Sequence, residues 1–312
     1  MNCPICHHAS GHTRFTPREM MFGLREPIDY WCCGGCRMLW IARIPEDLGR
    51  YYGQGYYSQQ APHAKFSTQP LSCLKRERAR HHLGESTWAG ALMAKLGRQP
   101  THFIWLRPFQ LSLTSSILDL GCGTGGLLLK LRREGFTNLL GADPFLPETL
   151  HHPSGVTILA SPLERIDGHF DLIMLHHALE HMPDQHATLE RLRERLNPGG
   201  GLLIRIPVAQ TYAHRRYGVH WAAWDAPRHL YLHSVTSLHR LAEQHGFAIF
   251  ARHHDARPEN LLGCEFYQRN ISHPEWSRYP FPPETVQAMR RLTERLNATL
   301  DGDTACFYLR KT

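Results

Sequence analysis

The chain lacks several features that would assign it to a large class of proteins. Its 312 residues contain no run of 18 consecutive apolar residues, which excludes a transmembrane helix. The first residues form neither a basic stretch nor an apolar stretch, so we expect no signal peptide and a cytoplasmic, reducing environment. The sequence also lacks internal repeats, low-complexity tracts and a dense block of lysine and arginine.

The charge of the chain is only mildly positive. Lysine and arginine number 35 against 28 aspartate and glutamate, a net charge of +7 with neutral histidine. This excess fits an anionic small substrate, a nucleic acid, or no charged partner, and it falls short of the basic block of a dedicated nucleic-acid-binding protein. The few basic clusters are Arg76, Arg78 and Arg80, and Arg215 with Arg216.

Four of the nine cysteines form two C-x2-C pairs, Cys3 with Cys6 and Cys33 with Cys36. In a reducing compartment such pairs are metal ligands more often than disulfides, and four thiolates favour Zn²⁺. Cys32 is an alternative metal ligand to its neighbour Cys33. Cys33 is the better candidate, because it keeps the C-x2-C spacing to Cys36 and leaves Gly34 and Gly35 between the two ligands. We therefore predict a structural zinc ion. The remaining cysteines and the nearby histidines are expected to be ordinary thiols and surface residues: Cys73, Cys122, Cys264 and Cys306, and His7, His8 and His12.

The composition divides the chain unequally. Residues 1–57 are rich in cysteine, glycine and aromatic residues and predict a small metal-stapled module. Residues 58–109 predict a polar linker, from Ser58 to His63, followed by N-terminal helices that include a helical pattern from Leu71 to about Leu96. Residues 110–312 predict the main domain, with a helical insertion at about 257–302.

Strand and helix patterns alternate through the main domain. Short apolar runs separated by helices predict a parallel sheet covered on both faces. Ser234 is a candidate N-cap, Gly135 and Gly246 are candidate helix ends, and a turn is expected at 197–201. The predicted strands are 116–120, 139–142, 156–159, 170–175, 202–206, 247–250 and 305–309, with helices around 127–131, 185–196 and 234–245.

A glycine-rich turn, Asp119 to Gly126, leaves the first of these strands and enters a helix. Glycine allows a tight turn, and the free N–H groups at a helix start favour an anionic group. Gly121, Gly123 and Gly126 satisfy G-x-G-x-x-G, and Asp143 follows about 20 residues later, where an acid can accept from ribose hydroxyls. This pattern admits two ligands, a nicotinamide or flavin dinucleotide and S-adenosylmethionine.

Residues 119–125 resemble the D-x-G-C-G-x-G signature of class I S-adenosylmethionine-dependent methyltransferases. The resemblance continues in order through residues 170–173, 177–184, 196–200 and 224–230, and it covers about 110–255 plus the last strand. It implies a Rossmann-like, doubly wound α/β fold with seven strands. The module of residues 1–57, with its exit from Ile44 to Tyr57, resembles the N-terminal zinc-ribbon-like module of sugar C-methyltransferases. By that resemblance the zinc is structural, and the tyrosines of the exit either wall the acceptor pocket or pack against the main domain.

The resemblance also implies roles for single residues. Asp119 and the turn residues Gly121, Cys122, Gly123 and Gly125 would hold the amino-acid end of the cofactor, and Asp143 with Pro144 its ribose. Ser161 and Leu163 would flank the adenine, although the acidic residue common after the third strand is missing. His176 and His177 would face the methyl-transfer centre.

A general base is needed only where the acceptor must lose a proton. The candidates are His177, Glu180, His181, Asp225 and His229. Sugar C-methyltransferases keep a Glu-His pair where this chain has Arg228 and His229. The resemblance therefore implies His229 as the base, and the departure suggests that Arg228 binds a phosphate or carboxylate of the acceptor. His177, at the tip of the fourth strand, is the second predicted catalytic residue.

The predicted function is methyl transfer from S-adenosylmethionine to a small, anionic or neutral acceptor such as a sugar, nucleotide sugar or glycan precursor. An RNA-modifying methyltransferase with a zinc ribbon and an NAD(P)-binding oxidoreductase are the alternatives. Nothing in the sequence selects oxygen, nitrogen or carbon as the methylated atom, or an oligomeric state.

Overall fold

The computed structural model describes residues 1–52, 70–85, 87–96 and 100–312. The last five residues of the predicted tyrosine-rich exit, from Gly53 to Tyr57, and the predicted polar linker lie outside the described residues.

The main domain is built on a sheet of eight strands in the order β11-β12-β9-β8-β4-β5-β7-β6. The five strands from β9 to β7 run parallel to one another, and β12, β11 and β6 pair antiparallel at the two edges. The bounds are β4 Ser116–Leu120, β5 Asn138–Ala142, β6 Leu150–His151, β7 Thr157–Leu159, β8 Phe170–His176, β9 Leu196–Pro207, β11 Phe247–His254 and β12 Thr304–Lys311.

The predicted seven strands are all present, and β6 is an eighth. This two-residue edge strand is too short to give a hydrophobic pattern. The turn expected at 197–201 is instead part of β9, whose register shifts against β8 between Phe170 and Leu172. Ser234 does cap a helix, because its side chain accepts from the Ser237 amide.

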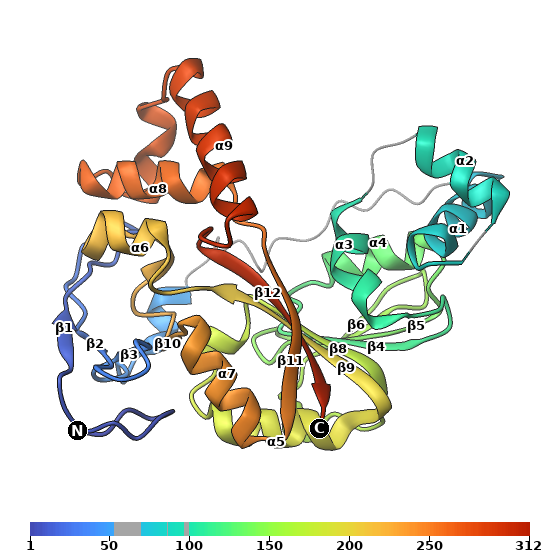
Figure 1. Cartoon of the computed structure of the whole chain (residues 1–312), viewed down its shortest axis with the longest axis horizontal. Coiled ribbons are helices and arrows are strands. Elements are labelled where there is room, and N and C mark those ends of the chain that lie inside the picture. Colours follow the sequence, from blue (N-terminus) through green and yellow to red (C-terminus); the bar gives the residue numbers. More distant parts are fainter. Residues whose placement is uncertain (53–69, 86, 97–99) are drawn as a thin grey trace.

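Helices cover both faces of the sheet, as expected for a doubly wound fold (Figure 1). Alternate residues of one strand point to opposite faces, so Leu172 packs with α3 and α4 while Ile173 packs with α5 and α7. The helical pattern expected at 71–96 is two helices that turn at Leu83–Gly84. The bounds are α1 Pro70–His82, α2 Trp88–Leu96, α3 Thr101–Leu106, α4 Gly126–Glu134, α5 Gln185–Arg195 and α7 Val235–Gln244.

The N-terminal module and the main domain share a second sheet. Its order is β1-β2-β3-β10, and β10 (Tyr231–Leu232) comes from the main domain. The module strands are β1 Thr13–Phe15, β2 Tyr30–Cys32 and β3 Leu39–Ile41, followed by the 3-10 helix η1, Leu48–Tyr52. The module therefore depends on the main domain for its edge strand.

The insertion at 257–302 is helical, as predicted. It contains α8 Pro258–Gln268, the 3-10 helix η8 His273–Arg278, and α9 Pro283–Ala298. In Figure 1 these helices lie above α6, Tyr212–Tyr217. Leu261 and Cys264 of α8 share a core with the module residues Tyr30 and Leu39. No helix among the described residues is long and apolar enough to cross a membrane.

Candidate active site and metal centre

The glycine turn lies between β4 and α4 and is packed too tightly for side chains. Gly121, Gly123 and Gly125 have φ angles of 73°, 54° and 78°, a left-handed region that glycine adopts easily. A Cβ on Gly121 would lie 2.6 Å from the Cβ of Ala178, and one on Gly125 2.4 Å from Ile158. The turn therefore needs glycine at these positions and presents its backbone at the carboxyl edge of the sheet.

Two carboxyl groups, those of Asp119 and Asp143, lie next to this turn. Asp143 accepts hydrogen bonds from the amides of Gly123 (2.8 Å) and Phe145 (2.9 Å). Asp119 is 2% exposed, and its Oδ1 has no hydrogen-bond partner among the described residues. Burial and the nearby charge of Asp143 raise the pKa of Asp119 to about 8, so this side chain is largely protonated at neutral pH.

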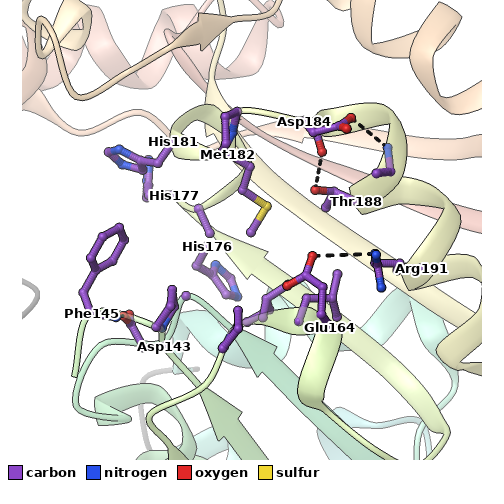
Figure 2. A pocket seen from close by; sticks show the side chains of 18 of the residues that line it. Asp143, Phe145, Glu164, His176, His177, His181, Met182, Asp184, Thr188 and Arg191 are labelled. Carbon is purple, nitrogen blue, oxygen red and sulfur yellow. Dashed lines mark hydrogen bonds and ion pairs between the residues drawn. The ribbon is translucent and has the colours of Figure 1, made fainter. Parts of the chain in front are cut away.

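A cavity of about 550 Å³ opens at this edge of the sheet (Figure 2). Segments that follow four neighbouring strands meet there because parallel strands end at the same edge. Its lining consists of Tyr52, Leu120, Gly121, Asp143, Pro144, Phe145, Pro162, Leu163, Glu164, His176, His177, Ala178, His181, Met182, Pro183, Asp184, Ala187, Thr188 and Arg191.

The lining includes six of the predicted cofactor and catalytic residues: Gly121, Asp143, Pro144, Leu163, His176 and His177. The others do not line it: Asp119, Cys122, Gly123, Gly125, Ser161 and His229. The Ser161 hydroxyl donates to the carbonyl of Pro162. Sequence reasoning missed Phe145 and the pair Glu164–Arg191 on the opposite side of the cavity (Figure 2). The Phe145 ring stacks on that of Tyr52, which belongs to the predicted tyrosine-rich exit.

The predicted exit tyrosines have two different environments. Tyr52 lines the cavity and its hydroxyl lies 3.1 Å from the His181 Nδ1. Tyr51 is buried, and its hydroxyl donates to Glu26. Within the described part of the exit, one tyrosine therefore borders the cavity and the other packs the module.

The two histidines that end β8 are held in fixed positions. His176 packs against Trp105, and burial, aided by Arg205, lowers the pKa of His176 to about 3. His177 has a φ of 54° and both of its ring nitrogens are engaged. Its Nε2 faces the Arg205 guanidinium, which can only donate, so Nδ1 carries the proton and donates to Glu180 Oε1 (3.2 Å).

His229 lies behind His181. Its side chain is buried, at 5% exposed, and its ring packs edge-on against His181 with 4.7 Å between centroids. The Nδ1 is 2.8 Å from the carbonyl oxygen of Ala223, which can only accept, so Nδ1 carries the proton. The Nε2 faces two carboxylate oxygens, 3.8 Å from Asp225 Oδ2 and 4.0 Å from Glu180 Oε1.

The two carboxylates beside His229 remain charged. Glu180 is buried, which raises its pKa, but the neighbouring histidines outweigh burial and leave the pKa of Glu180 at about 2. Asp225 is likewise buried, and Arg228 and His229 lower its pKa to about 2. An imidazolium at position 229 would therefore face two negative charges.

The expectation that Arg228 binds an anionic group of the acceptor is wrong. Its side chain is 0% exposed and is held by groups of the protein. It donates to Glu19 Oε1 (3.0 Å), Asp225 Oδ1 (2.6 Å) and the carbonyl of Tyr51 (2.9 Å). Its partner Glu19 is 209 residues away in sequence, so no local pattern could reveal this role.

The four predicted metal ligands come together in the module. The Sγ atoms of Cys3 and Cys36 are 3.7 Å apart, those of Cys6 and Cys33 are 3.4 Å apart, and all four lie within 4.8 Å of one another. Tetrahedral zinc with Zn–S bonds of about 2.3 Å places its sulfurs about 3.8 Å apart. The donor set therefore fits zinc.

The two cysteine pairs form matching turns, here called the knuckles. The amides of Cys3 and Cys33 donate to the carbonyls of His8 and Met38, and those of His7 and Arg37 donate back to Cys3 and Cys33. Cys32 points away from the cluster, toward Gln210. His12 is half-buried rather than a surface residue, because its Nδ1 accepts from the Gly34 amide.

Comparisons with known proteins find similarity to methyltransferases. A family described as "Methyltransferase domain" matches residues 91–251, just over half of the chain. A trans-aconitate 2-methyltransferase of Deinococcus radiodurans is 31% identical over 109 residues, 33% of this chain and 42% of that protein. A ubiquinone biosynthesis O-methyltransferase of Erwinia tasmaniensis is 34% identical over 94 residues, 27% of this chain and 39% of that protein. The chain thus spans about two fifths of the length of these relatives.

The solved structures that match are more distant in sequence. A mycolic acid cyclopropane synthase complexed with SAH is 15% identical with a TM-score of 0.42, over 64% of this chain and 78% of that one. A phosphoethanolamine N-methyltransferase 2 of Haemonchus contortus is 17% identical with a TM-score of 0.43, over 76% and 56%. Because the family match covers more than half of the chain, the chain belongs to the methyltransferase domain family. Its main domain is a class I S-adenosylmethionine-dependent methyltransferase domain.

Proposed function

We propose that this chain transfers a methyl group from S-adenosylmethionine to a small acceptor. The observation that carries the proposal is the cavity bounded by the glycine turn after β4, Asp143 after β5 and the histidines that end β8. A ligand bound outside the carboxyl ends of parallel strands would contact all three.

The cofactor site follows from this placement. The backbone from Gly121 to Gly125, with Asp119 below it, is assigned to the amino-acid end of the cofactor. Asp143 and Pro144 are assigned to the ribose, and Leu163, with Ser161 before it, to the adenine. His176 and His177 lie at the end of the central strand, where the methyl group would be presented.

S-adenosylmethionine supplies a methyl group on positively charged sulfur, so the protein mainly has to align the acceptor and exclude water. Of the two predicted catalytic histidines, His229 is the better candidate base, because Nδ1 is anchored on the Ala223 carbonyl and the carboxylates that face Nε2 would stabilise a proton taken there. His177 has both nitrogens engaged and instead fixes Glu180. Movement of the His181 ring would give His229 access to the acceptor.

The acceptor is proposed to be a small molecule such as a sugar, nucleotide sugar or glycan precursor. The curated relatives are named for trans-aconitate and for ubiquinone biosynthesis, both small molecules. Three arginines of the predicted basic clusters, Arg78, Arg80 and Arg215, are paired with carboxylates. This pairing weakens the RNA alternative, whose test is a steep salt dependence of RNA binding.

Calorimetry with the full chain tests the cofactor assignment. Binding of S-adenosylhomocysteine that weakens in an Asp143→Asn variant supports the proposal. No binding of S-adenosylhomocysteine, together with binding of NAD(H), would overturn it in favour of an oxidoreductase.

We also propose that Cys3, Cys6, Cys33 and Cys36 hold a structural Zn²⁺. Both knuckles contact the main domain, and no residue of either knuckle lines the cavity, which supports a structural role. Metal analysis of the purified chain should give about one zinc per chain. A metal-free chain that keeps its fold would contradict the assignment.

A further inference from the structure

A buried chain of charged groups leads from the N-terminal module to His229. Its first member, Glu19, is 0% exposed and does not line the cavity. The carboxylate accepts from the amides of Phe22 and Leu24, which fixes its position, and from Arg228. Glu19 is thus held by its own loop and aimed at a residue of the main domain.

Arg228 connects two carboxylates. Its Nη2 donates both to Glu19 and to Asp225, while Nη1 donates to the carbonyl of Tyr51. The other oxygen of Asp225 faces His229 Nε2 at 3.8 Å. Beyond His229 the contacts continue through Glu180 to His177.

The balance of charge in this chain depends on Glu19. With Glu19 ionised, two carboxylates share the positive charge of Arg228. Asp225 then interacts more strongly with His229, because less of its negative charge is balanced by Arg228. Without the charge of Glu19, the buried guanidinium would draw more strongly on the charge of Asp225. The surroundings of His229 would become more positive, which disfavours the imidazolium.

We propose that Glu19 is a positioning residue for methyl transfer, acting through Arg228 and Asp225 to set the proton affinity of His229. This inference rests on the proposed function, since it assumes His229 as the base. It gives the metal-bound module a part in the chemistry, although none of its described residues before Tyr52 lines the cavity.

Other ionisable groups also face this region, and the test must hold them constant. They are Glu180 and His181 from the 3-10 helix that follows β8, Tyr30 from β2, Tyr267 from α8 and His273 from η8. A substitution at Glu19 leaves all of them in place.

The experiment is an NMR titration of the full chain carrying ¹³C-labelled histidine. The His229 signal is identified by its loss in a His229→Gln variant. In Glu19→Gln we expect the midpoint of the His229 titration to fall by about half a pH unit relative to wild type. The control is Glu26→Gln, the same change in the same module, because Glu26 contacts Arg50 and Tyr51 rather than Arg228.

An unchanged midpoint in Glu19→Gln, or an equal shift in Glu26→Gln, would overturn the inference. Glu19→Asp keeps the charge but lengthens the contact with Arg228, so its midpoint should fall by a smaller amount. If Glu19→Gln does not fold, Glu19→Asp decides alone, and an unchanged midpoint rejects the inference. Calorimetry with S-adenosylhomocysteine on the wild type separates the two proposals, because absent binding rejects the proposed function whatever the titration gives.

Discussion

The hydroxyl of Ser234 donates a 2.6 Å hydrogen bond to the main-chain carbonyl oxygen of Cys36. The same hydroxyl caps α7 by accepting from the Ser237 amide at 3.0 Å. At the other end of α7, Gln244 donates to the carbonyl of Ile5 in the first knuckle. Both knuckles are therefore fixed to one helix of the methyltransferase domain, which explains how so small a module shares the core of its neighbour.

Replacing Ser234 by alanine removes both the helix cap and the anchor of the second knuckle. We expect the free energy of unfolding to fall by about 2 kcal/mol, as measured by urea denaturation. Asp184 caps α5 by accepting from the Ala187 amide and contacts no knuckle, so Asp184→Ala should cost only about 1 kcal/mol. Equal losses in the two variants would mean that the knuckle contact contributes nothing.

Cys32 and Cys33 are neighbours in sequence with opposite roles. Cys33 belongs to the four-sulfur cluster, whereas Cys32 is buried against Gln210. Cys33→Ser should lower the zinc content from about one ion per chain to near zero, because one thiolate of the tetrahedral set is lost. Cys32→Ser should keep its zinc. Metal analysis checks both, and the reverse outcome would assign Cys32 to the metal.

The parts of the fold that were predicted from sequence are those specified by local patterns. The bounds of β4 agree with the predicted 116–120 because an apolar run ends there in a glycine turn. The Ser234 cap was likewise readable from one polar residue before an amphipathic helix. The strands β6 and β10 have two residues each, too few for a periodic signal, and β10 pairs with β3 about 190 residues earlier in the chain.

The candidate site divides in the same way. Asp119, Asp143 and the glycines follow strands, so topology alone gathers them at one edge. The environment of Arg228 depends on Glu19 and Tyr51, which the chain brings together only after the module docks. Arg228 is therefore buried by residues that are distant in sequence, and this burial keeps it from contacting a substrate.

Asp119 should couple cofactor binding to proton release. Its pKa, raised to about 8 by burial and Asp143, keeps the carboxyl protonated in the free protein at pH 7. The cofactor's ammonium group would favour the carboxylate and expel that proton. Calorimetry of S-adenosylhomocysteine binding in buffers of different ionisation enthalpy should detect the release in wild type. Asp119→Asn should bind about tenfold more weakly and release no proton from this site.

Asp119→Asn should weaken cofactor binding but increase the stability of the free protein at high pH. Because the folded pKa of Asp119 is raised, its contribution to stability is present below the unfolded pKa of about 4 and is lost as pH rises toward 8. Asp119→Asn should therefore be more stable than wild type to urea at pH 8 without ligand. Equal stability at pH 8 would mean that the carboxyl is not forced to ionise there.

Five histidines should make the protein sensitive to acid. Burial is the main cause that lowers the pKa of each, to about 3 for His176 and about 4 for the others: His102, His181, His214 and His233. These side chains are neutral in the folded protein and take up protons on unfolding, where their pKa is about 6.5. Their contribution to stability is full above pH 6.5 and decreases as pH falls toward 4. Each uncompensated proton costs about 1.4 kcal/mol per pH unit.

His102 offers the sharpest test of this acid sensitivity. It is buried in α3 beside Phe103, and its Nε2 has no hydrogen-bond partner among the described residues. His102→Phe removes one group that must protonate and loses no bond at that nitrogen, so its acid-unfolding midpoint should lie at lower pH than that of wild type. His169 is exposed, and His169→Phe is the matched control, expected to leave the midpoint unchanged. Circular dichroism between pH 7 and pH 3 measures both, and a midpoint for His102→Phe at or above the wild-type value would show that this histidine does not limit acid stability.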